Sequence, residues 1–241
     1  RGALSVAKQI PEKDKKFGIT AASAGNHAIA AAWAAKVESL SAKVVMQTSA
    51  NPFRISLAKT YGAEIIMKEG GVATFAKADK LVREEKRTFI HPFDGVDTTL
   101  GAAGVGLELI KDCTELDAVV VAVGGGGLMS GVAAAVKLKN SKCKVYGVEP
   151  RGANSMSQSM VVNKPVTLDS VNTIADSLAP PMALPFSYSI CKEFVDQFVT
   201  VTDDQICAGL FLLQEECKLA VEPAAGAVLA GAIWPLRKKL A

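Results

Sequence analysis

An apolar run that ends in four consecutive glycines constrains the fold of this chain more than any other feature. Residues 118–123 are all Ala or Val, and Gly124, Gly125, Gly126 and Gly127 follow them directly. Such a run predicts a strand that is buried on both faces of a sheet, as parallel strands are. A helix-like pattern over residues 128–138 comes next, so the glycines predict a strand-to-helix turn whose amide groups can bind an anion.

The number of glycines in this turn indicates a ligand. Glycine costs about 0.5–1 kcal/mol relative to alanine in ordered structure, and a bare turn needs only one or two. Four in succession indicate that a ligand approaches the backbone, and the following helix N-terminus favours a phosphate group. The spacing of a dinucleotide fingerprint and the Lys-Ser/Thr pair of a P-loop are both missing, which predicts a smaller ligand with one phosphate. A purely structural turn is the alternative.

A second turn of the same kind occurs near the start of the chain. Ser23-Ala24-Gly25-Asn26-His27 lies between a predicted strand, residues 17–22, and a predicted helix, residues 25–36. One interpretation is an ordinary connection capped by Ser23 or Asn26. The other is a carboxylate site formed by backbone amides, with the Asn26 amide facing a polar ligand atom. His27 by itself is more typical of a structural histidine than of a catalyst.

Short β-branched runs alternate with helical patterns through most of the chain. This alternation predicts an α/β fold with mostly parallel, twisted sheets flanked by helices. We expect a small domain over residues 18–95, and a large domain formed by residues 1–17 and 96–241. Residues 151–186 contain four prolines and predict a long loop with one short helix rather than part of the core. Thr202 to Gln205 match a capping box, and Pro223 suits the first position of a final helix.

Composition excludes several classes of function. The formal net charge of +3 is small and its basic residues are scattered, which argues against a nucleic-acid surface. No apolar segment approaches about 20 residues, so we expect no membrane span. Five widely spaced cysteines without a Cys-x-x-Cys pair are typical of reduced thiols in a cytoplasmic protein. The two histidines lie far from them in the sequence, which argues against a zinc site.

Several motifs, taken together and in order, resemble the fold-type II pyridoxal-phosphate enzymes, whose fold is tryptophan-synthase-β-like. Within them the chain is most similar to the serine/threonine dehydratase (threonine ammonia-lyase) and serine racemase group. The motifs are Arg1-Gly2-Ala3, Ser23 to His27, His91-Pro92-Phe93-Asp94, Gly124 to Leu128, Gly147-Val148-Glu149-Pro150, Thr173-Ile174-Ala175-Asp176 and Val221-Glu222-Pro223-Ala224.

The resemblance implies a role for each loop. Gly124, Gly125, Gly126, Gly127 and Leu128 would bind the phosphate of pyridoxal 5′-phosphate. Asn26 would contact the 3′ oxygen of its ring, and Glu222 would lie near the ring. Ser23, Ala24, Asn26 and His27 would bind the carboxylate of a small amino-acid substrate. A homodimer or higher homo-oligomer is implied by the resemblance alone.

The implied reaction is β-elimination of water from a 3-hydroxy amino acid such as L-threonine or L-serine, which yields a 2-oxo acid and ammonia. Serine racemase is an alternative. In the racemases of the group, the position that resembles Ala24 carries a second serine, which can return a proton to the opposite face of the substrate. Alanine cannot donate a proton, so Ala24 favours a dehydratase. A third hypothesis is a non-catalytic, truncated remnant that binds pyridoxal phosphate.

The chain departs from the family pattern at three places and matches part of it at a fourth. The Schiff-base lysine of the family stands two residues before the Arg-Gly-Ala motif, so we expect it upstream of Arg1 and name no catalytic residue here. The polar partner of the pyridine nitrogen is expected beyond Ala241. Glu149 and the carbonyl of Ala153 resemble part of a monovalent or divalent cation site, although a solvent-facing Glu149 is an equal alternative. Residues 101–104 depart from the family's Gly-Gln-Gly-Thr.

Overall fold

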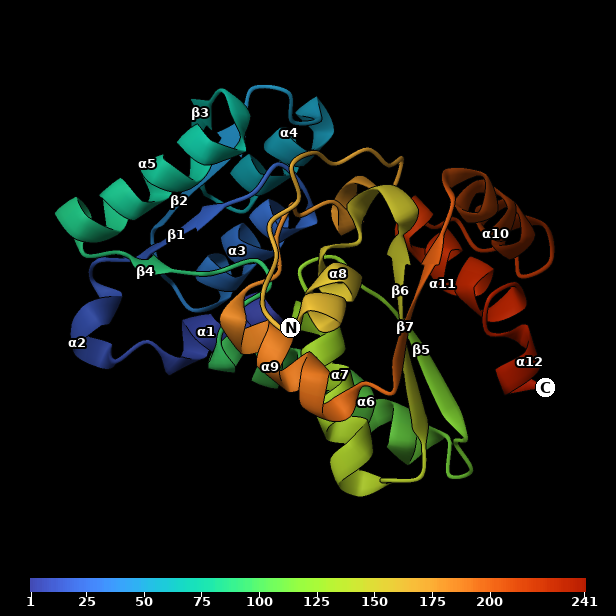
Figure 1. Cartoon of the computed structure of the whole chain (residues 1–241). Helices are drawn as coiled ribbons and strands as arrows, with labels where there is room; N and C mark the ends of the chain where they lie inside the picture. Colours follow the sequence, from blue (N-terminus) through green and yellow to red (C-terminus); the bar gives the residue numbers. More distant parts are fainter. The chain divides into compact units, whose positions relative to one another are not determined.

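The structure, a computed structural model, describes residues 1–241 and divides into two compact units. Unit 1 comprises residues 1–92 and 96–101, and unit 2 comprises residues 93–95 and 102–241. Each unit contains one sheet of parallel strands with helices packed against it (Figure 1). The predicted α/β class with parallel strands is confirmed.

Unit 1 is built on a four-stranded sheet in the order β3-β2-β1-β4. Its strands are β1 (Ile19–Ala22), β2 (Ala42–Gln47), β3 (Glu64–Lys68) and β4 (Thr88–Phe89). Its helices are α1 (Gly2–Gln9), α2 (Glu12–Lys15), α3 (Asn26–Val37), α4 (Pro52–Thr60), α5 (Gly70–Glu85) and the start of α6 (Val96–Asp112). Strand β4 contains only two residues. The ladder ends early because Pro92 has no amide hydrogen to donate.

The two faces of this sheet bury different helices. On one face the small side chains of α3, including Ala28 and Ala31, pack against Ile19 and Val44. On the other face Ala78 and Leu81 of α5 pack against Ala22 and Val45. Helix α1 joins the first cluster through its buried alanines. Residues 1–17 therefore group with unit 1, whereas the sequence assigned them to the large domain.

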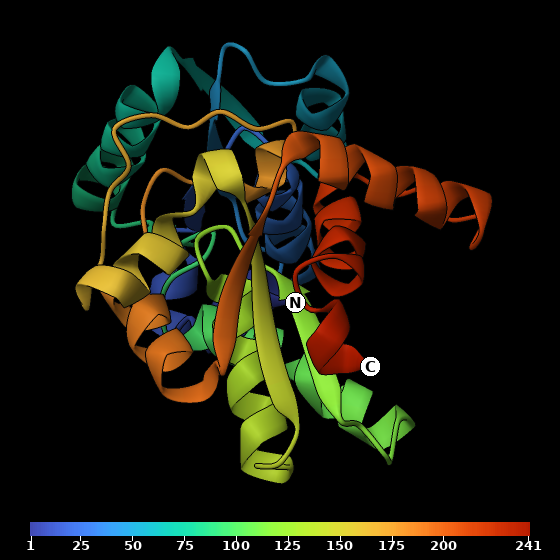
Figure 2. The same cartoon turned by 45° about the vertical axis from the view of Figure 1, so that its right-hand side comes forward.

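Unit 2 contains a three-stranded sheet in the order β5-β6-β7. The strands are β5 (Ala118–Ala122), β6 (Lys144–Pro150) and β7 (Gln197–Val201). Its helices, besides the rest of α6, are α7 (Gly127–Lys139), α8 (Ser155–Val162), α9 (Pro185–Phe194), α10 (Asp203–Glu215), α11 (Pro223–Ile233) and α12 (Arg237–Leu240). Val119 and Val121 belong to the core cluster that includes residues of α7, while Val120 and Ala122 belong to the cluster that includes residues of α11. Figure 2 shows these two helices on opposite sides of the sheet.

The segment from residue 151 to residue 186 is more ordered than the sequence predicts. It contains α8 and two 3₁₀ turns, η1 (Arg151–Ala153) and η2 (Asp176–Leu178), and an isolated bridge joins Thr167 to Met182. Met156 and Leu178 are buried in the core of unit 2. The expectation of a loop outside the core is therefore wrong here. Elements this short are too brief to show a helical or strand period in the sequence.

Two predictions about helix ends are confirmed. The Thr202 hydroxyl accepts a hydrogen bond from the Gln205 amide at 3.2 Å, and the Gln205 side chain accepts one from the Thr202 amide at 2.9 Å. Pro223 is the first residue of α11. None of the helices combines the length and the apolar character needed to cross a membrane.

Candidate functional site

The glycine loop of unit 2 joins strand β5 to helix α7. Gly126 adopts a left-handed conformation with φ of 91° at the N-cap, and no side chain caps the helix. The hydrogen bonds of the protein use none of the backbone amides of residues 125–128. Gly125, Gly126 and Gly127 are nevertheless buried. A buried donor without a partner costs about 1–3 kcal/mol, so this loop is built to receive an acceptor.

The structure gives a different reason for the glycines from the one that the sequence suggests. A Cβ atom on Gly125 would lie 2.2 Å from the ring of Phe93, and one on Gly127 would lie 2.7 Å from the Phe93 Cα. A Cβ on Gly126 would lie 2.6 Å from Met156. The glycines are therefore needed because protein packs closely behind the loop. Their amides still have no acceptor within the protein.

These features fit a phosphate group. The open amides stand at the N-terminus of a 13-residue helix, where the helix dipole favours negative charge. Glu222 precedes α11, and its carboxylate accepts a hydrogen bond from the Ser177 hydroxyl at 3.2 Å. The carbonyl oxygen of Ser177 lies 3.3 Å from where a Cβ on Gly124 would stand. Ser177 therefore connects Glu222 to the glycine loop.

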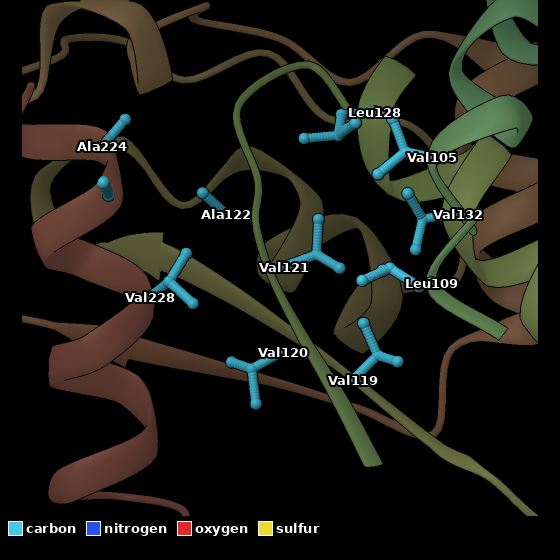
Figure 3. A pocket seen from close by; sticks show the side chains of 11 residues that line it. Val105, Leu109, Val119, Val120, Val121, Ala122, Leu128, Val132, Ala224 and Val228 are labelled. Atoms are coloured by element: carbon cyan, nitrogen blue, oxygen red, sulfur yellow. The ribbon is translucent and has the colours of Figure 1, made fainter. Parts of the chain in front are cut away.

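An apolar pocket lies beside this loop. Its volume is about 330 Å³. Leu128 of α7, Ala122 of β5 and Ala224 of α11 contribute to its lining (Figure 3). Leu128 is 47% exposed, although it follows three buried glycines. The loop thus offers an apolar side chain next to its polar amides.

In unit 1, Ser23 to His27 join strand β1 to helix α3. The Gly25 amide donates to the Ser23 hydroxyl at 3.1 Å, and Gly25 is the N-cap without a side-chain cap. The interpretation that Ser23 or Asn26 caps this helix is therefore wrong, since no side chain caps it and the Ser23 hydroxyl accepts from the Gly25 amide within the turn. The amides of Ala24 and His27 donate to no acceptor within the protein. They are free for a carboxylate.

His27 is held as a neutral side chain. Its Nε2 lies 2.9 Å from the carbonyl oxygen of Ile90, which can only accept, so Nε2 carries the hydrogen. Burial lowers the pKa of His27 to about 4, and His91 acts in the same direction. The contact fits the structural role that the sequence suggests for this histidine.

Arg54 is a candidate that the sequence analysis missed. It lies on α4, and its guanidinium would stand 3.4 Å from a Cβ on Gly25. A positive charge beside the open amides of this turn favours an anionic ligand there. Only the packing of α4 against α3 brings Arg54 to the turn, and nothing in its sequence context signals it.

The predicted cation ligands lie in unit 2. Glu149 is fully buried at the end of β6, so the alternative of a solvent-facing carboxylate is wrong. Its oxygens accept from the amides of Met156 and Ser157 at 2.8 Å and 2.7 Å, and also from the Ser157 hydroxyl. Burial raises the pKa of Glu149 to about 7. Ala153 is buried in η1, and a cation at Glu149 and Ala153 stays a prediction.

Comparison with known proteins identifies the family. The sequence profile of the pyridoxal-phosphate dependent enzymes matches residues 1–241. Phenylserine dehydratase from Ralstonia pickettii is 43% identical over 241 residues, which cover 100% of this chain and 74% of the relative. The structure of maize serine racemase has a TM-score of 0.95 at 32% identity, and covers 99% of this chain and 72% of the maize chain.

A threonine deaminase has the same fold. The processed form of isoform 2 from Solanum lycopersicum has a TM-score of 0.93 at 30% identity, with 96% of this chain and 68% of that chain covered. These proteins share with this chain both sequence and architecture over nearly its full length. The chain therefore belongs to the pyridoxal-phosphate-dependent enzyme family, among relatives that are named as dehydratases, deaminases and serine racemases.

Proposed function

We propose that this protein catalyses β-elimination of water from a 3-hydroxy amino acid such as L-threonine, L-serine or phenylserine. Water then hydrolyses the resulting enamine to a 2-oxo acid and ammonia. The observation that carries the proposal is the glycine loop, whose buried amides have no acceptor in the protein. Its relatives include a phenylserine dehydratase and a threonine deaminase, which favours dehydration.

The proposed cofactor contacts lie mainly on the glycine loop. The amides of residues 125–128 would hold the phosphate, and Glu222 and Asn26 would lie near the ring and its 3′ oxygen. When bound, pyridoxal phosphate supplies an electron-withdrawing ring that stabilises negative charge at the substrate α-carbon. The chain orients the group by its phosphate, which is the part that the loop can recognise.

The Ser23 to His27 turn would hold the substrate carboxylate. The open amides of Ala24 and His27 supply two donors, and Arg54 supplies positive charge beside Gly25. Because His27 is neutral, it adds no charge of its own to this contact. Binding by amides and a nearby guanidinium suits the α-carboxylate of any amino acid, so the turn sets orientation more than side-chain choice.

Ala24 favours elimination over racemisation. A racemase needs a group that returns a proton to the opposite face of the substrate α-carbon, and the methyl group of alanine cannot do this. Serine at this position would supply a hydroxyl. We therefore propose dehydratase activity as the main reaction, with serine racemisation as the second candidate.

The test uses the longest gene product, because the resemblance places the Schiff-base lysine two residues before Arg1. The protein with pyridoxal phosphate is incubated with L-threonine, L-serine and phenylserine, and 2-oxo acid and ammonia are measured against a sample without cofactor. Equal amounts of both products support the proposal. D-serine from L-serine without 2-oxo acid would establish the racemase. An active protein should show visible absorbance from the bound cofactor, and reduction with borohydride should abolish it. A protein that shows no such absorbance would be a non-catalytic remnant.

A further inference from the structure

A hydrogen-bonded group of three residues lies behind the glycine loop of unit 2. Phe93, Asp94 and Ser187 form this group, which we call the latch. The Asp94 Oδ1 accepts from the Ser187 amide at 2.8 Å and lies 2.5 Å from the Ser187 hydroxyl oxygen. The carbonyl oxygen of Phe93 lies 2.9 Å from the same hydroxyl. One serine of α9 therefore holds two consecutive residues that come 94 and 93 positions earlier.

The latch contacts three consecutive glycines. The ring of Phe93 occupies the space that a Cβ on Gly125 would fill, at 2.2 Å from it. The backbone of Phe93 occupies the corresponding space at Gly127, with its carbonyl oxygen 2.8 Å away. The Cβ of Ser187 lies 3.2 Å from where a Cβ on Gly126 would stand. The latch is therefore in contact with three of the four glycines of the loop.

Burial makes these contacts specific. Ser187 is fully buried, the three glycines that the latch contacts are buried, and Phe93 and Asp94 are half-buried. Because Ser187 is shielded from solvent, leaving its amide or its hydroxyl unpaired would cost free energy, which favours one arrangement of its partners Phe93 and Asp94. A carboxylate acceptor also makes stronger hydrogen bonds than a neutral one. The direction of the loop amides therefore depends on where Ser187 holds Phe93.

We propose that Asp94 and Ser187 are positioning residues for the cofactor phosphate, which act by holding Phe93 against the glycine loop. The inference rests on the proposed binding of the phosphate by the amides of residues 125–128. Neither residue needs to touch the cofactor. Loss of the latch would leave the loop in place but free to tilt its amides away from the phosphate, which weakens phosphate recognition and leaves the rest of the cofactor contacts unchanged.

The experiment compares the binding of pyridoxal 5′-phosphate with that of pyridoxal, which lacks the phosphate. Asp94→Ala and Ser187→Ala remove the acceptor and the hydroxyl donor. Asp94→Asn keeps an oxygen acceptor, and Ser189→Ala makes the same serine change at an exposed position of α9 outside the latch. Dissociation constants for both compounds are measured by calorimetry on the purified full chain, with the melting temperature of each variant recorded without cofactor.

We expect Asp94→Ala and Ser187→Ala to raise the dissociation constant of pyridoxal phosphate about three- to tenfold, the effect of one or two lost buried hydrogen bonds. The constant for pyridoxal should stay unchanged. Asp94→Asn should recover most of the affinity, and Ser189→Ala should bind both compounds as the parent protein does. A general structural effect would instead weaken both compounds by the same factor, and that result would overturn the proposal.

Two further results are decisive. Ser187→Ala keeps the hydrogen bond from the amide of residue 187 to Asp94, so we expect this variant to fold even if Asp94→Ala does not. Unchanged affinity of Ser187→Ala for pyridoxal phosphate would overturn the proposal. A failure of the proposed reaction can be distinguished from a failure of the latch proposal, since the binding measurements need no substrate. A protein that prefers pyridoxal phosphate to pyridoxal but forms no 2-oxo acid refutes the function alone. Equal affinity of the parent protein for both compounds refutes the latch and the phosphate loop together.

Discussion

The Nε2 of His27 lies 2.9 Å from the carbonyl oxygen of Ile90, and this contact joins the first turn of α3 to the residue that follows β4. Both ends lie at the carboxyl edge of the parallel sheet of unit 1, beside the turn that begins at Ser23. The contact therefore fixes the part of α3 whose amides the substrate carboxylate is proposed to bind.

The first prediction concerns pH. The folded protein lowers the pKa of His27 from 6.5 to about 4, so the unfolded chain binds more protons between these values. Stability should be fully present above pH 6.5 and should fall as the pH is lowered toward 4, by as much as roughly 3 kcal/mol. His27→Gln keeps an amide donor and does not titrate. Urea unfolding at intervals from pH 4 to 7.5 should show a steeper loss in the parent protein, and parallel curves would contradict the prediction.

The second prediction concerns the close approach of Phe93 to Gly125. Gly125→Ala should lower the free energy of unfolding by about 1–3 kcal/mol, because the new methyl group overlaps the Phe93 ring. Adding Phe93→Ala opens that space, so the double variant should lose less than the sum of the two single changes. Gly71→Ala in α5 is the control, since a Cβ there meets only a side-chain atom at 3.9 Å. Simple additivity in denaturant unfolding would show that the ring does not constrain the loop.

The third prediction concerns Arg54 and depends on the proposed function. Arg54→Gln removes the positive charge beside Gly25 and should raise the KM for the amino acid about three- to tenfold, with little change in cofactor affinity. Lys59→Gln removes an exposed charge from the same helix and should leave the KM unchanged. Steady-state kinetics at several salt concentrations measure both effects. An equal rise in the two variants would mean that only net charge matters.

The fourth prediction concerns acid stability. Burial opposes ionisation of Asp196, but hydrogen bonds from Lys137, the Val145 amide and Lys144 lower its pKa from 3.8 to about 2. The stability from this carboxylate is present above pH 3.8 and is lost as the pH falls toward 2. Asp196→Asn should therefore cost about 1–2 kcal/mol at pH 7, allowing for solvent screening, and less at pH 2.5. Thermal unfolding at both pH values tests this, and an equal cost at both would argue against an ionic role.

Much of the fold could be predicted because its signals are local. A strand, a turn and a helix each depend on residues within about ten positions, so apolar runs and glycines locate β5, the glycine loop and α7. The capping box at Thr202 and Gln205 is equally local, and the structure contains both of its hydrogen bonds. Helix α9 and strand β7 were not predicted, because both elements are short and α9 begins at Pro185, directly after a segment with further prolines.

The candidate site was predictable in its backbone and less so in its side chains. Both turns were predicted from glycines that follow apolar strands. The sequence indicated the backbone amide donors of these turns, but not the side chains that surround them. Arg54, Ser187 and the buried state of Glu149 were not, because each depends on contacts between segments far apart in the chain. Residue spacing shows which face of an element is apolar, but not what covers that face.

The sequence by itself determined the order of most strands and helices, the two amide-rich turns and the family to which the chain belongs, since these depend on residue type and short spacing. Only the tertiary structure decided what lies behind the glycines and beside Gly25, and that α1 packs with unit 1. The physical reason is that close packing is a property of pairs of surfaces. A glycine reports that a side chain is absent, and only the fold shows that the Phe93 ring needs that space.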